Sequence, residues 1–136
     1  MSECIFCKIV DGQIPAAKLI ETEKVISFLD INPVNPGHAL VAPKRHVSSL
    51  LDLRQDELHV LMFVAKRVAA AVIRATGSPA FNILQNDGEA AGQIIDHVHF
   101  HVIPRDPEDG FRLGWRHLKY AEGQIEQLQQ AIQQNL

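Results

Sequence analysis

The chain has 136 residues, of which 46% are hydrophobic and 21% charged, and these values suit one globular domain with one core. Its formal net charge of −3 argues against general affinity for nucleic acid, which needs a basic surface to displace counterions. No apolar run approaches the ~20 residues that span a bilayer, and the N-terminus lacks the basic and apolar regions of a secretory signal. We therefore expect a cytoplasmic protein without nucleic-acid or membrane partners, whereas a small anionic ligand remains compatible with this charge.

The first half of the chain predicts a short helix, three strands and a long helix. These elements are expected at residues 5–10, 18–22, 25–29, 38–42 and 55–75. The long helix is the clearest, because apolar side chains recur at the i, i+3, i+4 spacing that gives a helix one apolar face. Asp52 with Gln55 is the predicted cap at the start of this helix, and Gly77 fits its end.

The second half predicts two further strands and a second helix, at residues 81–84, 97–103 and 124–133. Strands joined by short turns favour a mainly antiparallel sheet of about five strands, so the predicted fold class is α+β with one long helix on the sheet and a C-terminal helix. That helix is rich in glutamine, and its apolar stripe needs a docking surface. Phe111 and Trp115 are interpreted as core or dimer contacts, or less favourably as a cover over a neighbouring subunit's site.

Three histidines alternate with apolar residues at His97, His99 and His101. Because side chains alternate across a strand, the three imidazoles are predicted to share one face, with Val98, Phe100 and Val102 on the core side. An incidental polar strand would explain one histidine better than three. The row suits nucleophilic chemistry, but two histidines two residues apart can also ligate one ion, so a metal site stays open.

The histidine row belongs to a longer series of motifs. This series resembles the signature of the histidine triad (HIT) family of nucleotide hydrolases and transferases, and its pieces follow the order of that family. They are Asp30-Ile31, Pro36-Gly37-His38-Ala39-Leu40-Val41, Pro43-Lys44-Arg45-His46, Asn86, Gly92-Gln93 and the histidine row. The chain looks most like the bacterial form of the small purine-nucleotide phosphoramidases. This resemblance implies one HIT domain over residues 1–136, with a C-terminal extension at 108–136, and a homodimer paired through the long helix and an edge strand.

The resemblance also assigns roles to individual residues. His99 is implied to attack the α-phosphorus and to form a nucleotidyl-histidine, from which water releases the nucleoside monophosphate. His101 and His38 are implied to act at the same phosphate, with His101 helping to protonate the leaving group. The other implied nucleotide contacts are Asp30 to the ribose, Ile31 to the base, and Asn86, Gly92 and Gln93 to the phosphate. Ile94 departs from the serine of the eukaryotic members, which puts the leaving-group preference in question.

A second group of residues points to a zinc site. The spacing Cys4-x-x-Cys7 is half of a zinc site, although it is weak evidence alone. The resemblance to bacterial members adds His46 and His97, which would complete a closed tetrahedral site. Such a structural zinc has no open coordination position and is not required for the chemistry.

The first functional hypothesis is therefore a purine-nucleotide phosphoramidase. Hydrolysis of dinucleoside polyphosphates is a close variant that the histidine row cannot separate from it. A sugar-phosphate nucleotidylyltransferase is less favoured, because that branch resembles His-Pro-His and Val98 stands at the central position here. Two hypotheses of other classes are a metal-dependent hydrolase with the histidine row and His38 as ligands, and a non-catalytic nucleotide-binding protein.

Overall fold

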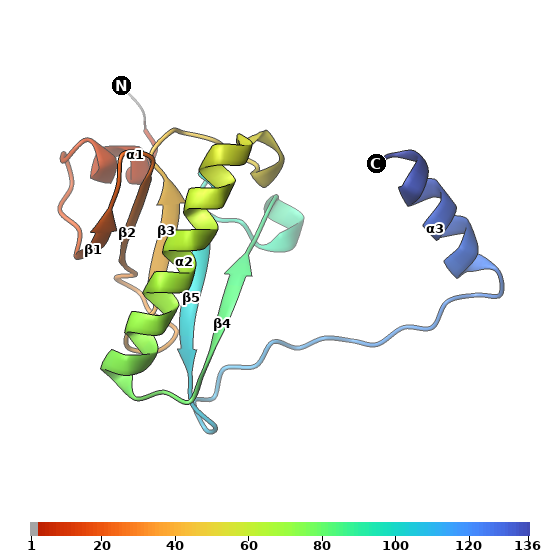
Figure 1. Cartoon of the computed structure of the whole chain (residues 1–136). Helices are drawn as coiled ribbons and strands as arrows, with labels where there is room; N and C mark the ends of the chain where they lie inside the picture. The colour runs from red at the N-terminus through yellow and green to blue at the C-terminus, as the bar shows by residue number, and fades with distance from the viewer. Residues whose placement is uncertain (1–2) are drawn as a thin grey trace.

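The computed structural model describes residues 3–136, which form a body and a C-terminal arm (Figure 1). The helices and strands are α1 (Ile5–Val10), β1 (Lys18–Glu21), β2 (Val25–Leu29), β3 (Ala39–Pro43), α2 (Gln55–Thr76), β4 (Ala80–Gln85), β5 (Phe100–Arg105) and α3 (Gln124–Gln134). The five strands form one antiparallel sheet in the order β1-β2-β3-β5-β4. This architecture confirms the predicted α+β class. None of the helices described for this range combines the length and hydropathy that crossing a bilayer requires.

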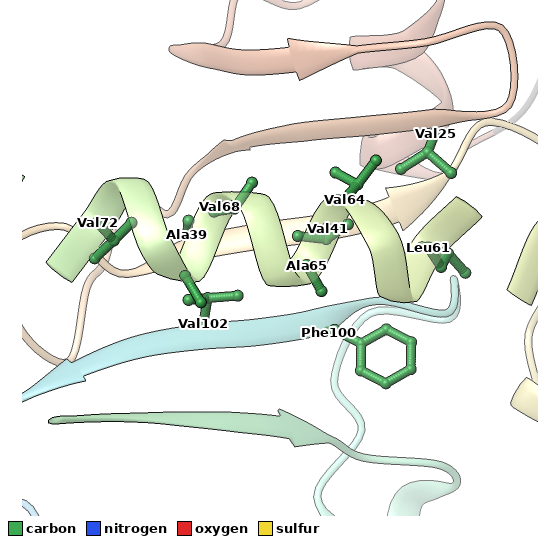
Figure 2. Close-up of a cluster of buried hydrophobic side chains, with 11 residues drawn as sticks. Val25, Ala39, Val41, Leu61, Val64, Ala65, Val68, Val72, Phe100 and Val102 are labelled. Atoms are coloured by element: carbon green, nitrogen blue, oxygen red, sulfur yellow. The ribbon is translucent and has the colours of Figure 1, made fainter. Parts of the chain in front are cut away.

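Helix α2 packs its apolar face on one face of the sheet (Figure 2). The face follows the predicted spacing, and it meets valines of β2, β3 and β5. The cluster comprises Val25, Ala39, Val41, Leu61, Val64, Ala65, Val68, Ala69, Val72, Phe100 and Val102. Gly77 ends the helix as predicted, because its φ of +75° lies in the left-handed region that glycine adopts without strain.

Helix α2 starts at the predicted residue, but the side chain that caps it differs from the prediction. The helix begins at Gln55 with Arg54 before it, and Glu57 makes the capping contact expected of Asp52 and Gln55. The Arg54 N–H donates to the Glu57 carboxylate at 2.8 Å, while Arg45 donates to both carboxylate oxygens at 2.7 Å. The Glu57 carboxylate accepts three hydrogen bonds and therefore caps the helix start better than Asp52, which lies one turn too early.

Replacing Glu57 with glutamine is expected to destabilise the body at neutral pH. The Arg45 guanidinium lowers the pKa of Glu57 to about 2, so the contribution of this carboxylate is complete above its unfolded pKa of 4.5 and is lost as the pH falls towards 2. We expect Glu57→Gln to lower the free energy of unfolding by about 2 kcal/mol at pH 7. Urea unfolding at pH 7 and at pH 3 measures this, with the exposed Glu122→Gln as control. A loss of the same size at both values would contradict the assignment.

Strand β5 begins at Phe100, three residues later than predicted. The preceding residues leave the sheet ladder, since the Val98 N–H donates to the Val47 carbonyl at 2.7 Å. Beyond the predicted end, pairing with β4 continues through Pro104 and Arg105. The predicted alternation is retained: Phe100 and Val102 face α2, and the histidines face the other side of the sheet. Val98 is buried but lies outside the α2 cluster.

That other side of the sheet carries α1. Alternate residues of β2 and β3 point towards it and form a second apolar cluster. The cluster comprises Phe6, Ile9, Ile26, Phe28, Leu40 and Ala42. This cluster contains no side chain of β5, beside which the histidines lie.

The arm follows β5 and carries α3, which lies apart from the body (Figure 1). The predicted helix is confirmed, but its stripe of Ile125, Leu128 and Ile132 is exposed. Trp115 is 77% exposed, so the interpretation as a core contact within one chain is wrong. Phe111 is partly covered, because the Arg105 guanidinium lies 4.8 Å from its ring centroid.

Candidate functional site

A cavity of about 450 Å³ opens on the α1 side of the sheet. One wall is apolar and comes from α1, residues 14–16, β2 and β3. The opposite end is polar and contains His99 and His101. The predicted nucleotide contacts that line this cavity are Asp30, Ile31, Asn86, Gly92, Gln93, His99 and His101. His38, also predicted to act at the phosphate, is not among the lining residues and contacts His101 instead. The fold thus brings together residues from four separate motifs in a space of a size typical for small-molecule sites.

His99 is held in one tautomer. Its Nδ1 lies 2.7 Å from the His97 carbonyl oxygen, and because a carbonyl only accepts, Nδ1 carries the proton. The lone pair therefore resides on Nε2. Burial lowers the pKa of His99, which favours the neutral ring. The edge of Phe6 packs on this ring with centroids 5.0 Å apart. The result is an oriented, neutral imidazole with a nucleophilic nitrogen.

A chain of hydrogen bonds also sets the tautomers of His38 and His101. The Val34 N–H donates to His38 Nδ1 at 3.0 Å, so the proton of His38 is on Nε2. That Nε2–H donates to His101 Nδ1 at 2.9 Å, which leaves His101 with its proton on Nε2. Burial, with His99 and His38 close by, lowers the pKa of His101 to about 4. His101 is therefore a neutral hydrogen-bond donor at pH 7.

Asp30 lies beside this chain. One carboxylate oxygen accepts from the Asn32 N–H at 2.8 Å, and the other lies 3.7 Å from His38 Nε2. The bond from the Asn32 N–H fixes the Asp30 side chain, which lines the cavity. The ligating atoms of Asp30, His38 and His101 lie within 4.8 Å of one another, a spacing that a metal ion could also use.

The loop before β5 is held by Gln93. Its Oε1 accepts from the Gly88 N–H at 2.7 Å, and its amide donates to the carbonyls of Ser48 and Ile95 at 3.0 and 3.1 Å. Both amide hydrogens are thus used within the protein, and Gln93 holds this loop in place. Gly92 has a φ of +90°, which disfavours a side chain there. Ile94 is 91% exposed at the cavity wall and offers only apolar contact.

The four predicted zinc ligands also come together. Cys4 Sγ lies 3.3 Å from His97 Nδ1, and Cys7 Sγ lies 3.4 Å from His46 Nδ1. All four ligating atoms lie within 4.8 Å of one another. His97 donates from Nε2 to the Pro43 carbonyl at 2.8 Å, so its Nδ1 lone pair faces the thiols. Two sulfurs and two imidazole nitrogens at these separations suit tetrahedral Zn²⁺, whose bonds are ~2.0–2.3 Å long.

The apolar wall and the hydrogen bonds that orient the histidines have no signature in the sequence. Phe6 stands between the two cysteines in sequence, yet nothing in the spacing indicates that its ring packs on His97 and His99. The Val34 N–H and the His97 carbonyl belong to the backbone, so no residue type marks them. The apolar character of α1 was the only available signal, and it is equally typical of a core helix.

Comparisons with known proteins place the chain among relatives. A family model described as "HIT domain" matches residues 11–108. The chain is 42% identical over 130 residues to the adenosine 5′-monophosphoramidase hnt1 of Schizosaccharomyces pombe, covering 95% of each protein.

Solved structures show the same fold. A HIT family protein from Bacillus subtilis superposes with a TM-score of 0.94 at 36% identity, covering 99% of this chain and 98% of the other. A HIT family protein from Bacillus anthracis gives 0.93 at 37% identity with the same coverage. A zinc-bound histidine triad family protein from Mycobacterium smegmatis gives 0.75 at 36% identity, covering 98% of this chain and 95% of the other. Because the family model matches most of the chain and the relatives span nearly all of it, the chain belongs to the HIT family.

Proposed function

We propose that this protein hydrolyses purine nucleoside 5′-phosphoramidates at the α-phosphate, with His99 as the nucleophile. The observation that carries the proposal is the hydrogen bond from His99 Nδ1 to the His97 carbonyl, which directs the lone pair to Nε2 at the wall of the cavity. The 42% identity to a relative described as an adenosine 5′-monophosphoramidase supports this substrate class.

In the first step, His99 Nε2 attacks the α-phosphorus and the P–N bond breaks. The departing nitrogen takes the proton of His101 Nε2 and leaves as the neutral amine, which keeps the electron pair of the broken bond. His38 holds His101 in that donating tautomer through the 2.9 Å bond. In the second step, water attacks the phosphorus of the nucleotidyl-histidine, the bond between His99 Nε2 and phosphorus breaks, and one proton of the water returns to His101 Nε2. This releases the nucleoside monophosphate and restores neutral His99.

The rest of the cavity suits a purine nucleoside. The apolar wall from α1 and residues 14–16 can stack against the base, with Ile31 at its rim. Asp30 lies between this wall and the histidines, where its carboxylate can accept from the ribose hydroxyls. Asn86 and the loop held by Gln93 lie at the phosphate end.

The ribose contact gives a testable consequence. Asn in place of Asp30 keeps an oxygen for the Asn32 N–H but loses the charge that binds the ribose hydroxyls. We expect Asp30→Asn to reduce kcat/KM for adenosine 5′-phosphoramidate by about 10-fold, the effect of one charge-assisted hydrogen bond. The 2′,3′-dideoxy substrate is the control, and its kcat/KM should change little. Equal losses on both substrates would place Asp30 outside the ribose contact.

We also propose that Cys4, Cys7, His46 and His97 hold a structural zinc ion. When bound, the metal would tie α1 to the segment after β3 and to the start of the histidine row. The four side chains complete the coordination, so the chemistry is left to His99 and His101. A homodimer paired through α2 and the β4 edge is a further part of this proposal.

A metal-dependent hydrolase is the second candidate, because Asp30, His38 and His101 bring three potential ligands together in the cavity. Dinucleoside polyphosphate hydrolysis is a third reaction that the same nucleophile could perform. Turnover of adenosine 5′-phosphoramidate and of diadenosine polyphosphates, each with and without chelator, separates the three. Our proposal expects chelator-resistant AMP release from the phosphoramidate, with slower turnover of the polyphosphates. Loss of activity in a chelated protein that stays folded would favour the metal-dependent reaction.

A further inference from the structure

The loop between β2 and β3 carries the group that sets the tautomer of His38. Residues 30–38 join the two strands, and the Val34 N–H within this loop donates to His38 Nδ1 at 3.0 Å. A backbone N–H can only donate, so it requires a bare nitrogen opposite it. The position of Val34 therefore decides whether His38 donates to His101 from Nε2 or accepts from it.

The side-chain amide of Asn35 ties this loop to the C-terminal end of β5. Its Nδ2 donates to the Pro104 carbonyl at 2.8 Å and to the Asp109 carboxylate at 2.9 Å. Within residues 3–136, no other hydrogen bond joins residues 31–37 to β5 or to the segment that follows it. Both hydrogens of the amide are therefore used to hold the loop.

Asp109 is a buried carboxylate that the proposed reaction does not use. Its side chain is 7% exposed, and it also accepts from the Arg105 guanidinium and from the N–H groups of Asp106 and Phe111. The Arg105 guanidinium holds the pKa of Asp109 well below its ordinary range, so this carboxylate is charged at pH 7. A charged carboxylate that three other residues hold in place is a firm acceptor for Asn35.

A second set of contacts supports the loop on another side. Gly37 has a φ of +98° and packs against the end of α2, where a Cβ at this position would lie 2.8 Å from Thr76 Cγ2. The His38 N–H donates to the Asn35 carbonyl at 3.0 Å, which closes a tight turn. Neither contact involves Val34, so the position of its N–H depends on the side chain of the next residue, Asn35.

We propose that Asn35 is a positioning residue for the reaction and that Asp109 holds it in place. The pair keeps the Val34 N–H on His38 Nδ1, which makes His38 the donor and leaves His101 with a proton on Nε2 for the departing nitrogen. If the loop shifts, His101 can instead donate from Nδ1 to His38, and its Nε2 then has no proton to give. This role rests on the proposed hydrolysis, and it assigns a function to the first part of the predicted C-terminal extension.

The first measurement reads the tautomers directly and needs no turnover. In ¹⁵N-labelled protein at pH 7, a ring nitrogen with a proton resonates far from one without, so NMR locates the protons of His38 and His101. We expect both protons on Nε2 in wild type and a measurable population with both on Nδ1 in Asn35→Ala. Asn82→Ala is the matched control, because Asn82 accepts from Arg105 at 2.6 Å without contacting the loop, and it should resemble wild type.

The second measurement separates proton donation from binding. Asn35→Ala should lower the single-turnover rate of P–N cleavage in adenosine 5′-phosphoramidate by about 5-fold, with the half-saturating concentration nearly unchanged. The p-nitrophenyl ester of AMP is the matched substrate. Its leaving group departs as a stable anion without a proton, so its rate should change less than about 2-fold.

Asp109→Ala tests the second member of the pair. This variant keeps the bond from Asn35 to Pro104 and should give a smaller loss of the same kind. The double variant should lose no more than Asn35→Ala alone, because Asp109 acts through Asn35. Thermal melting checks that each variant is folded, and Asp109→Ala replaces Asn35→Ala in both measurements if the latter does not fold.

Three results would overturn the positioning role. The first is a folded Asn35→Ala protein whose His38 and His101 tautomers match wild type. The second is an equal loss on the phosphoramidate and the ester, or a loss confined to half-saturation, which would mean that the loop only shapes the binding site. The third is the same tautomer change in Asn82→Ala, which would place its cause at Arg105. If wild type releases no AMP at all, the proposed hydrolysis is wrong, and the tautomer comparison still decides the role of Asn35.

Discussion

His99→Ala is expected to reduce AMP release from adenosine 5′-phosphoramidate by at least about 100-fold, because the variant has no nitrogen to form the covalent intermediate. The substitution removes the imidazole of His99. The His97 carbonyl holds this ring in one tautomer, and Phe6 packs against it in a T-shaped contact. The measurement is the initial rate of AMP release by purified wild type and variant. His59→Ala is the matched control, since His59 is exposed on α2 and should be dispensable.

Two further observations make this prediction specific. Circular dichroism should show that His99→Ala is folded, so the loss is not due to unfolding. AMP should still bind the variant, because Asp30 and the apolar wall are unchanged. Retention of more than about a tenth of the wild-type rate would contradict a nucleophilic His99, since loss of a covalent nucleophile has a larger effect than that.

Replacing both cysteines by serine is expected to cause the largest loss of stability. A bound zinc ion would stabilise the folded state, because the unfolded chain does not present the four ligands together. Cys4→Ser with Cys7→Ser should abolish bound zinc and lower the free energy of unfolding by about 3 kcal/mol or more. Metal analysis and urea unfolding measure the two effects. Lys8→Ser, a change in the same short helix, is the control and should retain the metal.

Removal of the metal should leave the hydrolytic activity unchanged. The bonds from His97 to Pro43 and from His99 to the His97 carbonyl do not involve the thiols. A chelated protein that stays folded is therefore expected to keep hydrolysing the phosphoramidate. If wild type purifies without zinc and the double variant is equally stable, the structural zinc assignment is wrong.

The elements with a clear periodicity were predictable from the sequence. The 3.6-residue spacing of α2 and the alternation of the histidines depend on one face being buried, and both faces are found where expected. The motif residues of the cavity were found through the resemblance. Their convergence follows from the sheet order, which places β3 beside β5 although 56 residues separate the end of one from the start of the other.

Other features depend on contacts that no local pattern records. Strand β5 starts late because Val98 bonds to Val47 instead of a neighbouring strand. Glu57 caps the start of α2 because Arg45, which lies before the helix and outside its capping motif, binds the Glu57 carboxylate. The tautomers of His38 and His101 follow from a backbone N–H of Val34. The exposed arm was interpreted partly as core, because composition does not show whether an apolar stripe faces its own chain or another.

The most direct test of the account is to trap the intermediate. Wild-type protein mixed with adenosine 5′-phosphoramidate and quenched within one turnover should carry one adenylyl group. Peptide mass spectrometry should locate this group on His99, and its acid lability should identify the bond as one between phosphorus and an imidazole nitrogen. We expect the adduct in wild type and in His59→Ala, and its absence in His99→Ala. An adduct on His101 or another residue would contradict the assignment of the nucleophile. Turnover without any adduct, lost on addition of chelator, would contradict covalent catalysis and favour metal-activated water.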